Sequence, residues 1–117
     1  MYTAEFNQIV ESRVKKTLDL LVNKAKEYAR EDRLHNFKVA ARLNGTTPTR
    51  EAHGFLTKHI VSYLDLLNDI DAGKKVSSER VEEKIGDIIT YFFLQEALIT
   101  EYMDKHVSSE KILSENS

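Results

Sequence analysis

Two acidic residues at helical spacing are the part of this sequence best suited to chemistry. Glu83 and Asp87 stand four positions apart, so on a helix they share one face. Paired carboxylates are ligands that Mg²⁺ and Mn²⁺ accept, and they can also position a water molecule. Lys84 lies between them, and its cation opposes a metal cluster but suits an anionic ligand. Two hypotheses follow: a metal site at Glu83 and Asp87, or an anion site that includes Lys84.

A second group of candidate residues carries hydrogen-bond donors. Lys58 and His59 are adjacent, and Ser62 follows four positions after Lys58. An ammonium, an imidazole and a hydroxyl together could bind phosphate oxygens. The alternative is a histidine satisfied in the core, flanked by a surface lysine.

A third candidate patch begins at Arg33. In a nucleotide site, Arg33 could bind a phosphate or ribose, Asn36 could read a base edge, and Tyr28 or Tyr91 could stack on the base. The alternative is that residues 33–37 start a helix and that Phe37 belongs to the core. The four glycines form neither of the common glycine-rich phosphate-binding motifs.

Composition narrows the class of protein. The chain has 117 residues, a formal net charge of −2 and no cysteine, so disulfides, thiolate zinc sites and a cysteine nucleophile are excluded. The small net charge predicts no attraction to nucleic acid or to membranes. No apolar run approaches the roughly 20 residues that span a bilayer, and the first residues lack a secretory pattern. We therefore expect a cytoplasmic protein, in the host cell if it is phage-encoded.

The hydrophobic pattern predicts an all-α fold, a bundle of about four helices. Apolar residues recur at helical spacing in four segments, and Asn44-Gly45, Thr47-Pro48 and Ser77-Ser78 supply helix stop and start signals. The expected helices cover residues 3–30, 34–43, 48–68 and 78–106. We expect a single helical domain over residues 1–106 and a polar C-terminal tail over residues 107–117.

The last predicted helix has apolar residues on two sides. One stripe contains Val81, Ile85, Ile88, Ile89 and Phe92; the other contains Glu83, Asp87, Tyr91, Leu94 and Leu98. A helix that is apolar on both sides must be covered on both sides. We expect the second stripe to face another subunit or a deep pocket, and hence an obligate homo-oligomer.

Four motifs together resemble a family of small bacteriophage and prophage proteins. That family is similar to the all-α nucleoside-triphosphate pyrophosphohydrolases of the MazG and dimeric dUTPase group. The resemblance covers roughly residues 26–101. The motifs are Lys26-Glu27-Tyr28-Ala29, Arg33-Leu34-x-Asn36-Phe37-x-x-Ala40, Lys58-His59-Ile60-x-Ser62 and Glu83-Lys84-Ile85-Gly86-Asp87-x-x-x-Tyr91.

The resemblance implies an oligomeric helical bundle. The sequence differs from the enzyme pattern at the metal-binding positions, and these differences argue against metal-dependent hydrolysis. The enzymes hold Mg²⁺ with acidic pairs on two facing helices. Here Lys84 replaces the acid three positions before Asp87, and the facing helix offers Lys58-His59. Because cations in place of carboxylates repel a metal, we expect Lys58, His59 and Lys84 to contact phosphates directly.

The leading hypothesis is therefore a phage-type protein without catalytic residues or cofactor. It would bind, and sequester, a nucleotide or a nucleotide-derived immune signal of the cyclic-nucleotide or ADP-ribose type, as an anti-defence sponge. Asp87 would orient Lys58 or His59. One alternative is a divergent Mg²⁺-dependent pyrophosphohydrolase or phage nucleotide-modification accessory, with Glu83 and Asp87 holding the metal. Another is a helical protein-interaction module.

Overall fold

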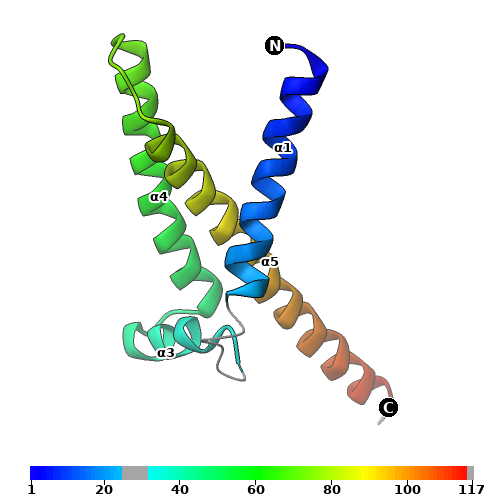
Figure 1. Ribbon diagram of the computed structural model, residues 1–117. Helices are drawn as coiled ribbons and strands as arrows, with labels where there is room; N and C mark the ends of the chain where they lie inside the picture. Colours follow the sequence, from blue (N-terminus) through cyan, green and yellow to red (C-terminus); the bar gives the residue numbers. More distant parts are fainter. Residues whose placement is uncertain (25–31, 116–117) are drawn as a thin grey trace.

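The computed structural model describes residues 1–24 and 32–115, with side chains as far as Val107. Its elements are α1 (Thr3–Leu18), a π-helical turn η1 (Asp19–Asn23), α3 (His35–Asn44), α4 (Pro48–Asp71) and α5 (Ser78–Glu115). Within these described residues every regular element is a helix, which confirms the all-α prediction. Figure 1 shows α4 and α5 as an antiparallel pair, α3 across one end, and α1 crossing α5.

The helix boundaries that depend on local capping agree with the sequence patterns. α3 ends where Gly45 takes a left-handed conformation (φ 66°), which only glycine adopts without strain. α4 begins with Pro48 in its first turn, and the Thr47 hydroxyl accepts a hydrogen bond from the Arg50 amide. Ser77 caps α5 in the same way through the Arg80 amide, at 3.1 Å. α5 continues to Glu115, beyond the helix end expected at residue 106.

The hydrophobic core lies where α3, α4 and α5 meet. Its buried members are Leu34, Phe37, Ala52 and Leu98, with Tyr91 and Leu94 packed against them. This corrects the prediction for the second stripe of α5. Tyr91, Leu94 and Leu98 face neither a subunit nor a deep pocket but pack inside their own chain. The first stripe, in contrast, ends in Phe92, whose side chain is 56% exposed.

Ion pairs hold α3 against α5 and fix the turn between α4 and α5. Lys38 of α3 lies 2.7 Å from both Asp32 and Glu101, and these carboxylates raise the pKa of Lys38. At the other end of the hairpin, Arg80 donates to Asp69 at 2.7 Å. The Lys38–Glu101 and Arg80–Asp69 pairs each join two different helices, so the residue spacing within one helix does not predict them.

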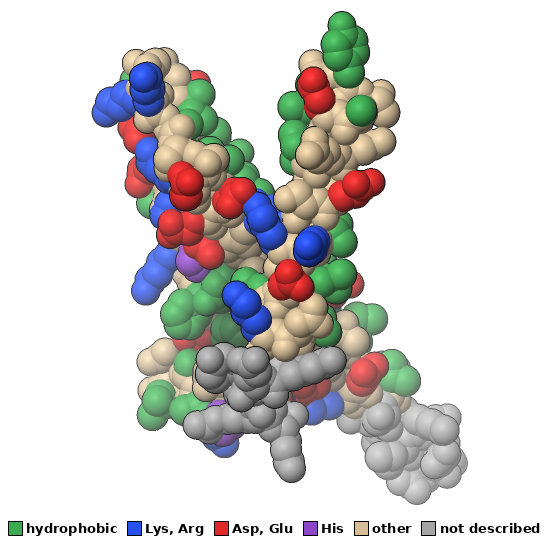
Figure 2. All heavy atoms as spheres, viewed as in Figure 1, with side chains coloured by type: hydrophobic (Ala, Val, Ile, Leu, Met, Phe, Trp, Pro, Cys, Tyr) green, Lys and Arg blue, Asp and Glu red, His purple; other side chains and the backbone are tan. Residues whose placement is uncertain are grey.

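The N-terminal helix packs differently from the prediction. The expected helix over residues 3–30 is α-helical from Thr3 to Leu18 and continues as the π turn η1 to Asn23; its residues 25–30 lie outside the described part. None of the α1 residues is buried. Figure 2 shows α1 and the α4–α5 pair as two arms of a V, with hydrophobic side chains along their inner edges.

None of the described helices combines the length and the apolar character needed to cross a bilayer.

Candidate functional site

His59 is the candidate residue with the most specific surroundings. It projects from α4 toward α5, where its Nδ1 lies 3.3 Å from Asp87 Oδ2, and its ring packs against Tyr91 with centroids 4.8 Å apart. Asp87 thus gives the His59 ring an anionic neighbour on α5. Burial and the Asp87 charge raise the pKa of Tyr91, so Tyr91 keeps its phenolic proton at neutral pH.

An aromatic stack extends this cluster along α4. Phe55 stacks on Tyr91 with centroids 6.0 Å apart and an interplanar angle of 23°, and it meets Phe37 edge-on at 6.3 Å. Lys58 Nζ lies 5.6 Å from the centre of the Phe55 ring, within the range of a cation–π interaction. The Phe55 side chain is 41% exposed, so this stack reaches the surface next to a cation.

Lys84 contributes a second cation on α5. Its Nζ lies 3.4 Å from Glu83 Oε1, so its ion-pair partner is the preceding residue and not Asp87, the i,i+3 partner that sequence spacing allows. The Lys84 side chain is 21% exposed, whereas that of Glu83 is 62% exposed. An exposed pair at this distance contributes little to stability, so an anion could replace Glu83 as the partner of Lys84.

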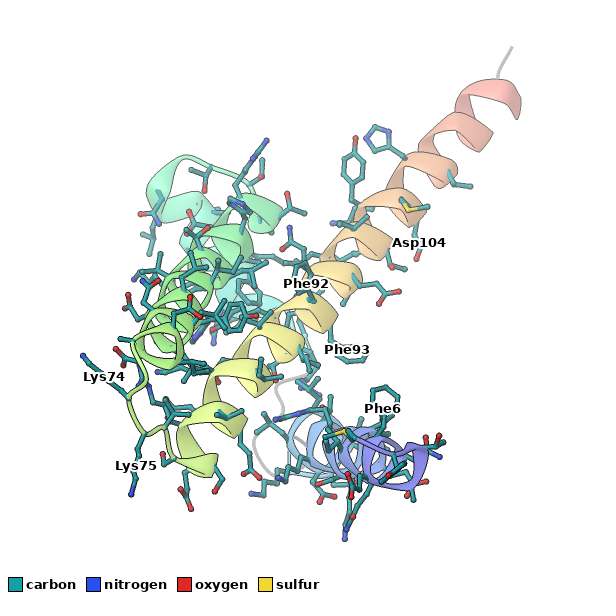
Figure 3. All side chains as sticks on the ribbon, turned by 90° about the horizontal axis from the view of Figure 1, so that it is seen from above. Phe6, Lys74, Lys75, Phe92, Phe93 and Asp104 are labelled. Atoms are coloured by element: carbon teal, nitrogen blue, oxygen red, sulfur yellow. The ribbon has the colours of Figure 1, made fainter. Side chains whose placement is uncertain are left out.

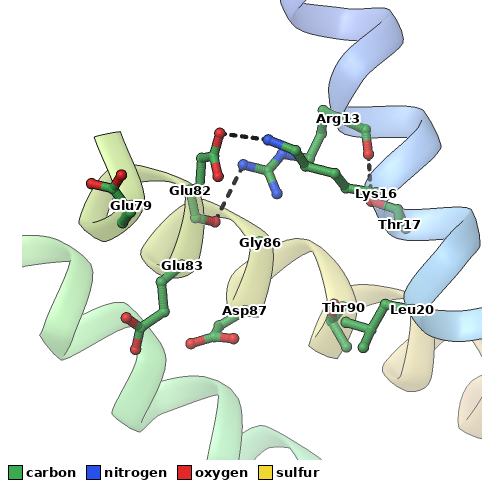
Figure 4. A pocket seen from close by; sticks show the side chains of 10 residues that line it. All are labelled: Arg13, Lys16, Thr17, Leu20, Glu79, Glu82, Glu83, Gly86, Asp87 and Thr90. Carbon is green, nitrogen blue, oxygen red and sulfur yellow. Dashed lines mark hydrogen bonds and ion pairs between the residues drawn. The ribbon is translucent and has the colours of Figure 1, made fainter. Parts of the chain in front are cut away.

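Glu83 and Asp87 also line a pocket between α1 and α5 (Figure 4), of about 300 Å³. Arg13 and Lys16 enter it from α1: Arg13 Nη2 donates to the Glu82 carbonyl at 3.2 Å, and Lys16 Nζ donates to the Glu82 carboxylate at 2.5 Å. Four carboxylates, of Glu79, Glu82, Glu83 and Asp87, line the pocket against these two cations. This excess of negative charge does not suit a phosphate.

Gly86 leaves room on α5 for the guanidinium group of Arg13. A β-carbon at Gly86 would lie 2.8 Å from Arg13 Nη1, closer than nonbonded atoms pack. Arg13 therefore lies across the part of α5 where a side chain is missing. Sequence reasoning singled out Gly86 only as part of a motif and missed Arg13, Lys16 and the pocket. A glycine inside a helix, which lowers helix stability, was the available signal.

The remaining candidate residues do not all converge on His59. Arg33 is exposed and donates to the Leu21 carbonyl at 3.2 Å, which ties the start of α3 to η1. Asn36 is exposed, and its neighbour Phe37 is buried. Ser62 is half-buried on α4. Tyr28 lies outside the described residues. α3 thus contacts the aromatic cluster through Phe37, which meets Phe55 of α4. Arg33 and Asn36 do not take part in this contact.

The residues near Asp87 do not by themselves form a metal centre. Asp87 faces His59 and Glu83 faces Lys84. Across residues 1–24 and 32–107, no three side chains of the types that ligate metals lie close enough to hold an ion. Under the metal hypothesis, Glu83 and Asp87 would need a further donor.

Comparison with known proteins gives no family assignment. No protein-family model matches the chain, and neither a curated protein nor a solved structure matches it. The geometry of the chain and the motif resemblance are therefore the two grounds for a functional proposal.

Proposed function

We propose that this protein binds a nucleotide or nucleotide-derived anion without hydrolysing it. We propose also that it is an all-α protein of phage type, and that it sequesters such a signal. The resemblance to phage proteins and to MazG-like pyrophosphohydrolases supplies the ligand class. The binding surface is the α4–α5 face around His59, with Lys58 and Lys84 as cations. The protein acts as a homo-oligomer in cytoplasm.

The observation that carries the proposal is the cluster of His59, Tyr91 and Phe55 on adjacent helices. It places an imidazole with a defined partner beside a partly exposed aromatic stack. Stacked rings bind the flat face of a base, and an imidazole can exchange hydrogen bonds with phosphate or ribose oxygens. Both kinds of contact are ones that nucleotides make.

Charge supports a phosphate on this face rather than in the α1–α5 pocket. Lys58 is exposed on α4 and, among the residues that the structure describes, contacts a ring instead of a carboxylate. Lys84 has only the exposed Glu83 as its ion-pair partner among the described residues. Charge-assisted hydrogen bonds to phosphate are stronger than such a surface pair, so binding would exchange a weak partner for a stronger one.

Isothermal titration calorimetry tests the proposal with a panel of nucleoside phosphates, cyclic oligonucleotides and ADP-ribose, and with inorganic pyrophosphate as a phosphate-only probe. Lys58→Ala and Lys84→Ala should each weaken binding about tenfold or more, the value of one charge-assisted hydrogen bond. Lys75→Ala removes the same charge from an exposed loop residue and should leave affinity unchanged. Absence of binding to every member of the panel would reject the proposal.

One observation favours the pyrophosphohydrolase alternative. Glu79, Glu83 and Asp87 follow one another at intervals of four along α5 and all line the α1–α5 pocket. This alternative predicts pyrophosphate release from nucleoside triphosphates that depends on Mg²⁺, stops with EDTA and disappears in Asp87→Ala. Binding without such release would support sequestration.

A further inference from the structure

The N-terminal helix has an apolar face that the described residues of its own chain leave exposed. Apolar residues recur every three or four positions along α1, so they share one side of the helix. Each of their side chains is 44% to 58% exposed. This α1 face consists of Phe6, Ile9, Val10, Val14 and Leu18.

A second exposed apolar surface lies on α5. We call Phe92, Ile99 and Met103 the α5 outer face; their side chains are 45% to 57% exposed, and their spacing places them on one side of the helix. Phe93 lies on an adjoining side, about 100° around the helix from Phe92. An open groove of about 510 Å³ runs along that side past Ala97 and Thr100, and the carboxylates of Glu96, Glu101 and Asp104 also line it. Seen from above, Phe6 of α1 points toward α5 and Phe93 of α5 points toward α1 (Figure 3).

The size of the exposed surface indicates how large the missing contact is. The chain exposes 9246 Å², whereas a compact protein of this mass exposes about 6,500 Å². Its radius of gyration is 18.6 Å, against about 13 Å for a compact domain of this length. The excess is about 2,700 Å² on one chain and about 5,400 Å² on two copies, at the upper end of the total area that obligate homodimers bury.

Within the described residues, α1 has little tertiary packing beyond the Arg13 and Lys16 contacts to Glu82 of α5. A helix of 16 residues is marginal in water without tertiary packing, and α1 has no buried residue of its own. The α1 face from Phe6 to Leu18 is about 18 Å long and the α5 outer face from Phe92 to Met103 about 17 Å, at 1.5 Å per residue. Two faces of equal length on one chain can cover each other reciprocally in a two-fold dimer.

We propose that a second copy of this chain covers both surfaces, the α1 face of each copy packing against the α5 outer face of the other. The contact uses apolar side chains on both helices. It is distinct from the α4–α5 face around His59 and does not depend on ligand binding there.

Analytical ultracentrifugation tests this with a matched pair of variants. Val14 and Val61 are 51% and 53% exposed, but Val14 lies on the α1 face and Val61 on α4. The wild-type chain should sediment at twice the 13.5 kDa of one chain or more. Val14→Asp should weaken association by about a hundredfold or more, because it places an unpaired charge in the contact. Val61→Asp should leave it unchanged. A monomeric wild-type chain at micromolar concentration, or equal dissociation by both variants, would overturn the proposal.

Disulfide cross-linking keeps the test decisive if Val14→Asp fails to fold. The chain has no cysteine, so an Ile9→Cys chain can be mixed with a Phe92→Cys chain and oxidised. Rapid formation of the mixed covalent dimer supports reciprocal packing. Leu43→Cys, on exposed α3 (81% exposed), is the control partner for Ile9→Cys. If Leu43→Cys cross-links as fast as Phe92→Cys, the two faces do not meet.

Discussion

Substitution of Gly86 by alanine separates the cost of a helical glycine from the value of the Arg13 contact. Gly86 lies inside α5, and Gly54 lies inside α4. An added β-carbon would meet Arg13 Nη1 at 2.8 Å at position 86 but nothing within 4 Å at position 54. The two glycines therefore differ mainly in whether the new methyl group has a neighbour.

The expected free energies follow from these surroundings. Glycine to alanine inside a helix stabilises by about 1 kcal/mol, so Gly54→Ala should gain about that amount. Gly86→Ala gains the same helix propensity but displaces Arg13 from its hydrogen bond to the Glu82 carbonyl. The loss of that exposed bond costs about 0.5–1 kcal/mol, because Arg13 is flexible and can move aside. The net gain for Gly86→Ala should be near zero to about 0.5 kcal/mol.

Urea unfolding followed by circular dichroism, at one protein concentration for all variants, measures the difference. Gly54→Ala should exceed Gly86→Ala by about 0.5–1 kcal/mol, or roughly 2–5 °C in Tm. In an Arg13→Ala background, Gly86→Ala should recover the full gain, since its neighbour is gone. If both glycine substitutions raise the free energy of unfolding equally, or if the double mutant is additive, Gly86 does not serve to leave room for Arg13.

Three further predictions concern the core, the helix turn and the candidate site. Leu66→Ala should destabilise by about 3 kcal/mol in urea unfolding, because this leucine is 2% exposed; Leu64→Ala, 48% exposed, should cost far less. The Arg80 hydrogen bond lowers the pKa of Asp69, so its stabilisation is present above the unfolded pKa and is lost as pH falls through the folded pKa. Asp69→Asn should therefore flatten the loss of stability below about pH 4, and an unchanged acid slope would contradict this. In an ultraviolet titration, Tyr91→Phe should remove a tyrosine that ionises above the ordinary range, because burial and Asp87 raise the pKa of Tyr91; loss of an ordinary tyrosine signal instead would argue against that environment.

Contacts between helices limited what could be predicted about the candidate site. Spacing identified Glu83, Asp87 and His59 as notable residues, yet it left open whether Asp87 pairs with Lys84 or with a residue on another helix. The structure places Asp87 at His59 and Lys84 at Glu83. The distances involved depend on how α4 and α5 are aligned, which no local pattern specifies.

The sequence by itself determined the helical class and the helix ends that have local chemical causes. Gly45 ends α3 and Thr47 begins α4, because caps act within one turn. Only the tertiary structure decided which apolar face of α5 is buried. Leu98 became core while Phe92 remained exposed, since periodicity defines the faces of a helix but not which neighbour covers them.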